Sequence, residues 1–176
     1  MAFGLSILMR KGDVTSNIRN MIDLGSQDRI KYGVVSGGST AIFFEDPDQP
    51  DEYHSMWRAM VQNRNSSLLS RVEDGVRRVR ESTDSDPFAF IGEKYMLEYH
   101  ASRAPCELKA VDGNVEDFSG EYHLAVTRHL DDATTNQLAN ALQQLKDSGR
   151  LEELYNKWWT ERNQCSGAPA DSTTCQ

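Results

Sequence analysis

Gly37-Gly38-Ser39-Thr40, followed by Ala41-Ile42-Phe43-Phe44, is the stretch that decides the fold of this chain. It comes after residues 28–35, whose alternation of apolar and polar side chains predicts a strand, and the two glycines predict a tight turn. Ser39 and Thr40 then predict a helix start, because hydroxyl side chains are favoured beside N–H groups that have no partner within the helix. Such a strand–turn–helix corner can hold a carboxylate.

A second segment, Phe88-Ala89-Phe90-Ile91-Gly92-Glu93, predicts a short apolar strand that ends in one acid. A carboxylate at such a strand end can accept charge-assisted hydrogen bonds from an ammonium group. One place for a carboxylate and one for an ammonium together indicate a free amino acid as ligand. From the residues alone, a plain helix cap at Ser39 and an exposed acid at Glu93 remain as alternatives.

The rest of the chain alternates between helix-like and strand-like patterns, which indicates an α/β fold. Residues 11–18 predict a polar connector, and residues 166–176 have the composition of a tail. Strands are predicted at 1–10, 107–111 and 122–127, and helices at 51–63, 72–81, 93–100 and on both sides of Gly149.

Size and charge exclude several classes of function. The chain has 176 residues, enough for one ordinary domain or two small lobes, and a net charge of -8 that argues against a nucleic-acid surface. No apolar run approaches the roughly 18 residues of a membrane span, and residues 1–10 lack the basic start and cleavage site of a signal peptide.

The cysteines and one glycosylation sequon indicate the cellular compartment in which the chain folds. The three cysteines are an odd number with wide spacing, which is no metal signature. Cys106 follows a proline in a loop and Cys165 follows a helix end, so we expect a disulfide between them, and hence an oxidising compartment. Asn65-Ser66-Ser67 is a glycosylation sequon, a pattern that also arises by chance.

No catalytic or metal-binding set emerges from the sequence. The four histidines are scattered over different predicted elements, whereas a metal site needs converging ligands. No Ser/His/Asp or Cys/His set has motif support. The sequence therefore predicts neither an enzyme nor a cofactor.

Several segments, in this order and spacing, resemble the second extracellular segment of ionotropic glutamate receptors. The Trp-Trp pair and Glu rather than Asp at Glu93 resemble the AMPA and kainate branch. Gly4-Leu5-Ser6-Ile7-Leu8 resembles the end of the first extracellular segment. The segments that carry the main resemblance are Lys31-Tyr32-Gly33, Ser36 to Thr40, Glu73-Asp74-Gly75-Val76, Phe88 to Glu93, Gly120-Glu121-Tyr122, Leu145 to Gly149, Lys157-Trp158-Trp159 and Cys165.

The resemblance implies a clamshell of the type II periplasmic-binding-protein kind, present as its lower lobe and part of its upper lobe. No residue here matches the upper-lobe arginine that clamps the ligand carboxylate, and no membrane segment is recognised. The implied divisions are 1–10 as a hinge strand, 11–18 as a connector in place of the membrane region, 19–120 as the lower lobe, 121–165 as a hinge strand with upper-lobe helices, and 166–176 as a disordered tail.

The same resemblance assigns roles to six residues. Gly38 would let the backbone approach the ligand, Ser39 and Thr40 would hold its carboxylates, and Glu93 would take its ammonium. Met96 would line the pocket, with core packing as the equal alternative. A further residue, Tyr122, would lie at the hinge near the ligand, or serve only as core.

The resemblance implies the amino-acid-binding part of a ligand-gated cation channel on the extracellular face of the plasma membrane. Its ligand would be glutamate or glycine, its partners other receptor subunits, and its membrane contact only through segments missing here. As given, the chain would be a water-soluble receptor fragment, a shortened transcript product or an engineered piece. The alternatives are a truncated, non-binding isoform that associates with full-length subunits, and a soluble solute-binding protein.

Overall fold

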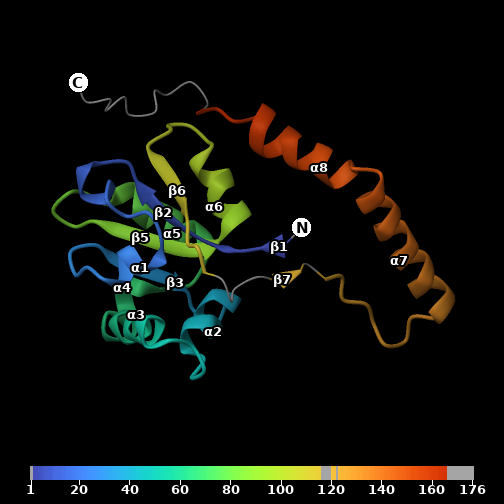
Figure 1. Cartoon of the computed structure of the whole chain (residues 1–176), viewed down its shortest axis with the longest axis horizontal. Coiled ribbons are helices and arrows are strands. Elements are labelled where there is room, and N and C mark those ends of the chain that lie inside the picture. The colour runs from blue at the N-terminus through green and yellow to red at the C-terminus, as the bar shows by residue number, and fades with distance from the viewer. Residues whose placement is uncertain (1, 116–119, 122, 166–176) are drawn as a thin grey trace.

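The computed structural model describes residues 2–115, 120–121 and 123–165. Its body is a five-stranded mixed sheet with helices on both faces, and a helical arm (residues 132–161) extends from the body and returns to it (Figure 1). The predicted tail, residues 166–176, lies outside the described residues.

The sheet has the order β4-β3-β5-β2-β6. β3 runs parallel to β4 and β5, while β2 runs antiparallel to both β5 and β6. A separate antiparallel pair joins β1 to β7. The strands are β1 (Ala2–Phe3), β2 (Leu5–Arg10), β3 (Lys31–Val35), β4 (Leu68–Leu69), β5 (Phe88–Glu93), β6 (Leu108–Asp112) and β7 (Gly120–Glu121).

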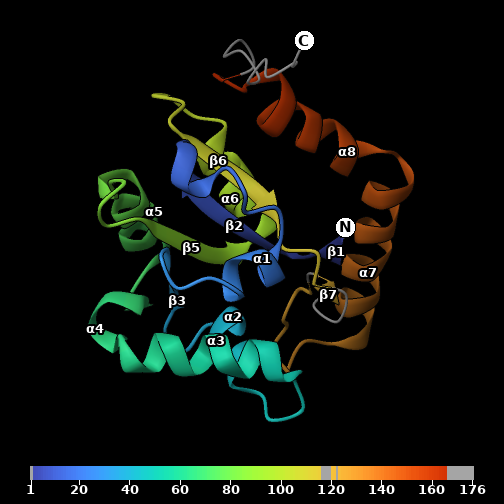
Figure 2. The same ribbon diagram turned by 60° about the vertical axis from the view of Figure 1, so that its left-hand side comes forward.

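Continuous burial along β2 and β5 follows from helices that cover both faces of the sheet (Figure 2). Ile7, Met9 and Ile91 lie in one apolar cluster, whereas Leu8 and Phe90 lie in the other, because side chains alternate along a strand. Helices α1 (Met21–Gly25), α2 (Ser39–Glu45) and α3 (Asp51–Gln62) contribute to the first cluster, and α5 (Val72–Glu81) and α6 (Lys94–Ala101) to the second.

The predicted helices and most predicted strands are present, with three differences. The expected strand at 1–10 is divided at Gly4 into β1 and β2. Short elements were missed: the 3-10 helix η1 (Asp13–Thr15), α1, and α4 (Arg64–Ser67) with its following strand β4. The prediction of a strand over 122–127 is wrong for 123–127, which have no regular secondary structure. A strand-like local sequence does not by itself make a strand, since each strand needs a partner for its backbone hydrogen bonds.

The arm consists of α7 (Asp132–Asp147), α8 (Arg150–Tyr155) and the π-helix η2 (Asn156–Glu161). Gly149 has φ +72°, a left-handed conformation that ends α7 and favours glycine. The structure describes every residue of α7 and buries none of them. In the described part of the chain, no helix has both the length and the apolar character needed to cross a bilayer.

Candidate functional site

The two halves of the predicted site lie at one edge of the sheet. β3 and β5 are parallel neighbours, with Gly33 paired to Phe90, so their carboxyl ends meet at the same edge. β3 leads into the turn before Ser39, and β5 ends at Glu93, which immediately precedes α6. In open sheets that contain parallel strands, this carboxyl edge is where ligands are commonly bound.

The first half is the start of α2. Gly38 occupies the N-cap position, Ser39 is exposed, and the Thr40 side chain is buried. Gly37 has φ +71°, whereas Gly38 has φ -85° and a Cβ added there would meet the Val35 carbonyl oxygen at an ordinary 3.5 Å. The turn therefore requires glycine at position 37, and the conformation at 38 is open to other residues.

The second half is Glu93 with the groove beside it. Glu93 is half-buried at the end of β5, and Met96 on α6 is 38% exposed, so Met96 is not a core residue in this structure. Both line a groove of about 510 Å³ between α6 and α8. The remaining residues that line this groove are Tyr95, Tyr99, Leu151, Leu154, Tyr155 and Trp159.

Four aromatic residues, Tyr95, Tyr99, Tyr155 and Trp159, hold the arm against α6. The rings of Tyr155 and Trp159 stack at 5.4 Å, and Tyr95 meets the Tyr155 ring edge-on at 5.6 Å. The Trp159 indole nitrogen donates to the Tyr95 carbonyl oxygen at 2.7 Å. Sequence reasoning missed this cluster, although each of its two pairs has the i, i+4 spacing that puts side chains on one helix face.

The pKa values of three ionisable side chains on or next to α6 are shifted, by an ion pair in one case and by burial in the other two. The Lys94 ammonium donates to the Asp112 carboxylate, which holds the pKa of Asp112 below its ordinary range. Burial beside the arm raises the pKa of Glu98. The nearby Lys94 charge opposes this, and so does the Tyr155 hydroxyl, which donates to the Glu98 carboxylate. Burial also lowers the pKa of His100, and the nearby Arg80 adds to this effect.

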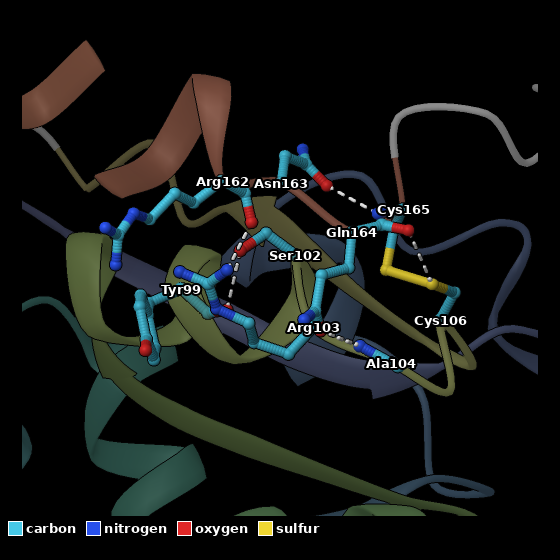
Figure 3. Close-up of a disulfide and its surroundings, with 9 residues drawn as sticks. All are labelled: Tyr99, Ser102, Arg103, Ala104, Cys106, Arg162, Asn163, Gln164 and Cys165. Carbon is cyan, nitrogen blue, oxygen red and sulfur yellow. Dashed lines mark hydrogen bonds between the residues drawn. A yellow bond between two sulfur atoms is a disulfide. The ribbon is translucent and has the colours of Figure 1, made fainter. Parts of the chain in front are cut away.

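The predicted disulfide between Cys106 and Cys165 is present, with the two Cα atoms 5.4 Å apart (Figure 3). It ties the chain after the arm to the loop after α6. Next to it, the Arg103 guanidinium donates to the Arg162 and Trp158 carbonyl oxygens and covers the Tyr99 ring at 4.1 Å. The far end of the arm is therefore fixed by covalent, polar and aromatic contacts.

Tyr122, the expected hinge residue, lies outside the described residues. Among the residues that the structure does describe, no three His, Cys, Asp or Glu side chains come together as metal ligands would.

No protein-family profile matches the chain. Human glutamate receptor 3 is 35% identical over 159 residues, which cover 90% of this chain and 17% of the relative. Glutamate receptor 2 of Caenorhabditis elegans is 31% identical over 177 residues, 92% of this chain and 17% of the relative. This chain is a homologue of the ionotropic glutamate receptors.

The structure of this chain supports its relationship to the glutamate receptors. The Drosophila muscle GluRIIB complex with glutamate matches it with a TM-score of 0.74 and 27% identity, over 91% of this chain and 59% of that chain. The mixed α/β sheet is therefore similar to that of a glutamate receptor ligand-binding domain, a fold of the type II periplasmic-binding-protein kind. The receptor homologue spans 17% of the length of these two curated relatives.

Proposed function

We propose that this receptor homologue supplies the lower lobe of a clamshell that binds a free amino acid, with glutamate as the first candidate. The observation that carries the proposal is that β3 and β5 are adjacent parallel strands, so that the helix start at Ser39 and Thr40 and the acid Glu93 follow the same end of the sheet. The match to a receptor structure described as a complex with glutamate supports the choice of ligand.

Each residue has a role that fits its place. Backbone N–H groups and hydroxyls at Ser39 and Thr40 hold the ligand carboxylates, because the first N–H groups of a helix lack acceptors within it. Glu93 accepts hydrogen bonds from the ligand ammonium, and half-burial makes such a charge-assisted bond stronger than it would be in water. Met96 forms the wall of the groove beside Glu93. Gly38 and Tyr122 complete the proposed set.

The remainder of the clamshell comes from a further segment of the receptor or from another polypeptide. Leu138, Leu142 and Leu145 support this part of the proposal, since each is about 40% exposed on α7 at helical spacing. In the assembled receptor, on the extracellular face of the plasma membrane, ligand binds between the lobes and closure opens the pore. Binding drives closure only through a higher affinity for the closed clamshell.

A second function, association with receptor subunits without ligand binding, is favoured by the same uncovered leucines. The two functions make different demands on Glu93, because association through α7 does not involve the sheet edge. A substitution at Glu93 therefore separates them.

The test is a titration of the ¹⁵N-labelled chain with L-glutamate, glycine and glutarate, followed through backbone amide signals. We expect L-glutamate to shift the signals of Ser39, Thr40 and Glu93, and glutarate, which lacks the ammonium, to bind at least tenfold more weakly. Glu93→Gln should abolish this discrimination, whereas Glu52→Gln, an exposed acid on α3, should behave like the parent chain.

Unfolding curves of both variants control for a loss of structure. Equal shifts from L-glutamate and glutarate in the parent chain would contradict the ammonium role of Glu93. If a folded chain shows no shift with any ligand and still binds receptor subunits, the association function stands and the ligand-binding proposal fails for this chain.

A further inference from the structure

The side chain of Asn65 differs from that of the nearby Asn63 in its hydrogen bonding. Its side chain is exposed, and within the described residues it makes no hydrogen bond or ion pair. The Asn63 amide, by contrast, donates to the Ala59 carbonyl oxygen at 2.9 Å. Asn65 is also the asparagine of the one Asn-X-Ser/Thr sequence in the chain.

We propose that Asn65 carries an N-linked oligosaccharide. The Cys106–Cys165 disulfide supplies an independent observation, since stable disulfides form in the oxidising compartments of the secretory pathway, where this modification also takes place. The inference does not rest on ligand binding, because Asn65 lies away from the sheet edge that holds Ser39 and Glu93.

The place of Asn65 in the fold leaves room for a bulky group. It belongs to α4, which immediately precedes β4, and β4 is an edge strand of the sheet. Asn63 and Ser67, on either side of it, line a small cavity with Lys31 and Tyr32 at the beginning of β3, whereas α2 and α6 begin after the other end of the parallel strands. Figure 2 shows α4 on the opposite side of the body from β7 and the arm. A glycan here would not cover the groove.

Burial of Ser67 fixes the order of events. The hydroxyl of this residue completes the sequon, yet Ser67 is only 2% exposed, and its carbonyl oxygen would lie 2.3 Å from a Cβ placed on Gly33. The transferase therefore has to act before α4 and β4 pack against β3. Transfer takes place on the growing or unfolded chain, and folding then leaves the glycan on the surface.

The chemical step uses a lipid-diphosphate-linked oligosaccharide as co-reactant. The bond between the sugar C1 and the diphosphate oxygen breaks, and a bond between C1 and Asn65 Nδ2 forms. Nδ2 loses one proton, and the lipid diphosphate leaves with the electron pair. No group is oxidised or reduced.

A glycan at Asn65 would also protect the edge of the sheet. β4 has only two residues, both leucines and both half-buried, and its outer side faces no strand within the described residues. Edge strands invite pairing with other chains, and a bulky polar group next to such an edge hinders this association.

The experiment expresses the full chain behind a cleavable signal sequence in eukaryotic cells, and examines the secreted fraction that carries the Cys106–Cys165 disulfide. We expect an increase in mass by one oligosaccharide, which peptide N-glycosidase removes with conversion of Asn65 to Asp. The modification should persist in Asn63→Gln and disappear in Asn65→Gln. A secreted, disulfide-bonded chain whose mass does not change with the glycosidase overturns the proposal.

A second arm tests the order of events with purified transferase and donor. The reduced, unfolded chain should be modified, and the folded, oxidised chain made without glycan should not be modified at a comparable rate. Equal rates for the two samples would overturn the requirement for transfer before folding.

Discussion

The body and the arm of this molecule are held by different forces. The body has two apolar clusters on the two faces of one sheet, with residues such as Ile7 and Phe90 at 0% and 1% exposure. The arm buries no residue of α7 and is attached through a disulfide, an aromatic cluster and the Arg103 contacts. The body is thus stabilised by its own burial, whereas the arm is stabilised mainly by attachment.

The sharpest test of this contrast is Phe90→Ala. Phe90 is at the centre of the cluster under α5, where a Cβ on Gly75 would lie 2.5 Å from its ring. Removing the ring leaves a cavity, and we expect a loss of about 4 kcal/mol in unfolding free energy, measured by urea and far-ultraviolet circular dichroism. Leu142→Ala, at 38% exposure on α7, should change it by less than about 0.5 kcal/mol. Equal losses would remove the distinction between the two regions.

Removal of the disulfide should act on the arm. For Cys106→Ser combined with Cys165→Ser, we expect a loss of about 3 kcal/mol, because the unfolded chain regains the freedom of a long closed loop. Amide hydrogen exchange should accelerate in α8 and η2 while β2 and β5 stay protected. Cys175→Ser, which leaves this bridge intact, is the control. Parallel loss of protection in both regions would show that arm and body unfold as one unit.

The two adjacent tryptophans allow a finer comparison within the arm. Trp159 is half-buried, stacks on Tyr155 and donates to the Tyr95 carbonyl oxygen, so Trp159→Ala should weaken the attachment by about 2 kcal/mol. Trp158 is 38% exposed under the Arg162 guanidinium, and Trp158→Ala should cost about 0.5 kcal/mol. The opening free energy of α8 amides in hydrogen exchange measures both. If Trp158→Ala costs more than Trp159→Ala, the arm contacts α6 through the other face of η2.

The smallest effects are pH dependences of opposite sign. Burial beside the arm raises the pKa of Glu98 above its ordinary 4.5. The contribution of Glu98 to the free energy of unfolding is therefore favourable at low pH and is lost as pH rises through the raised pKa. The pKa of Asp112 in the body is lowered by Lys94, so its contribution is present at neutral pH and is lost as pH falls through the lowered pKa.

Unfolding curves at several pH values, compared with those of Glu98→Gln and Asp112→Asn, measure these differences. On acidification the parent chain should gain stability relative to Glu98→Gln and lose it relative to Asp112→Asn. The same sign for both pairs would contradict this assignment.

Much of the fold follows from local sequence. Gly37-Gly38-Ser39-Thr40 predicted the corner between β3 and α2, and the pattern of residues 72–81 predicted α5. The periodicity of side chains and the turn preference of glycine act over a few residues, so they can be read without the fold. The disulfide, the helix start at Ser39 and the strand end at Glu93 were also predicted.

What local sequence did not determine depends on contacts between distant segments. Residues 123–127 were predicted to belong to a strand, yet they form none, because a strand exists only where a partner accepts its hydrogen bonds. Tyr95 and Trp159 are far apart in the sequence, and only the folded arm brings them together to form the groove beside Glu93. The sequence by itself thus determined most of the helices and strands and indicated the residues proposed for the site. The tertiary structure decided which faces meet, because packing energy depends on the complementarity of surfaces that no short window contains.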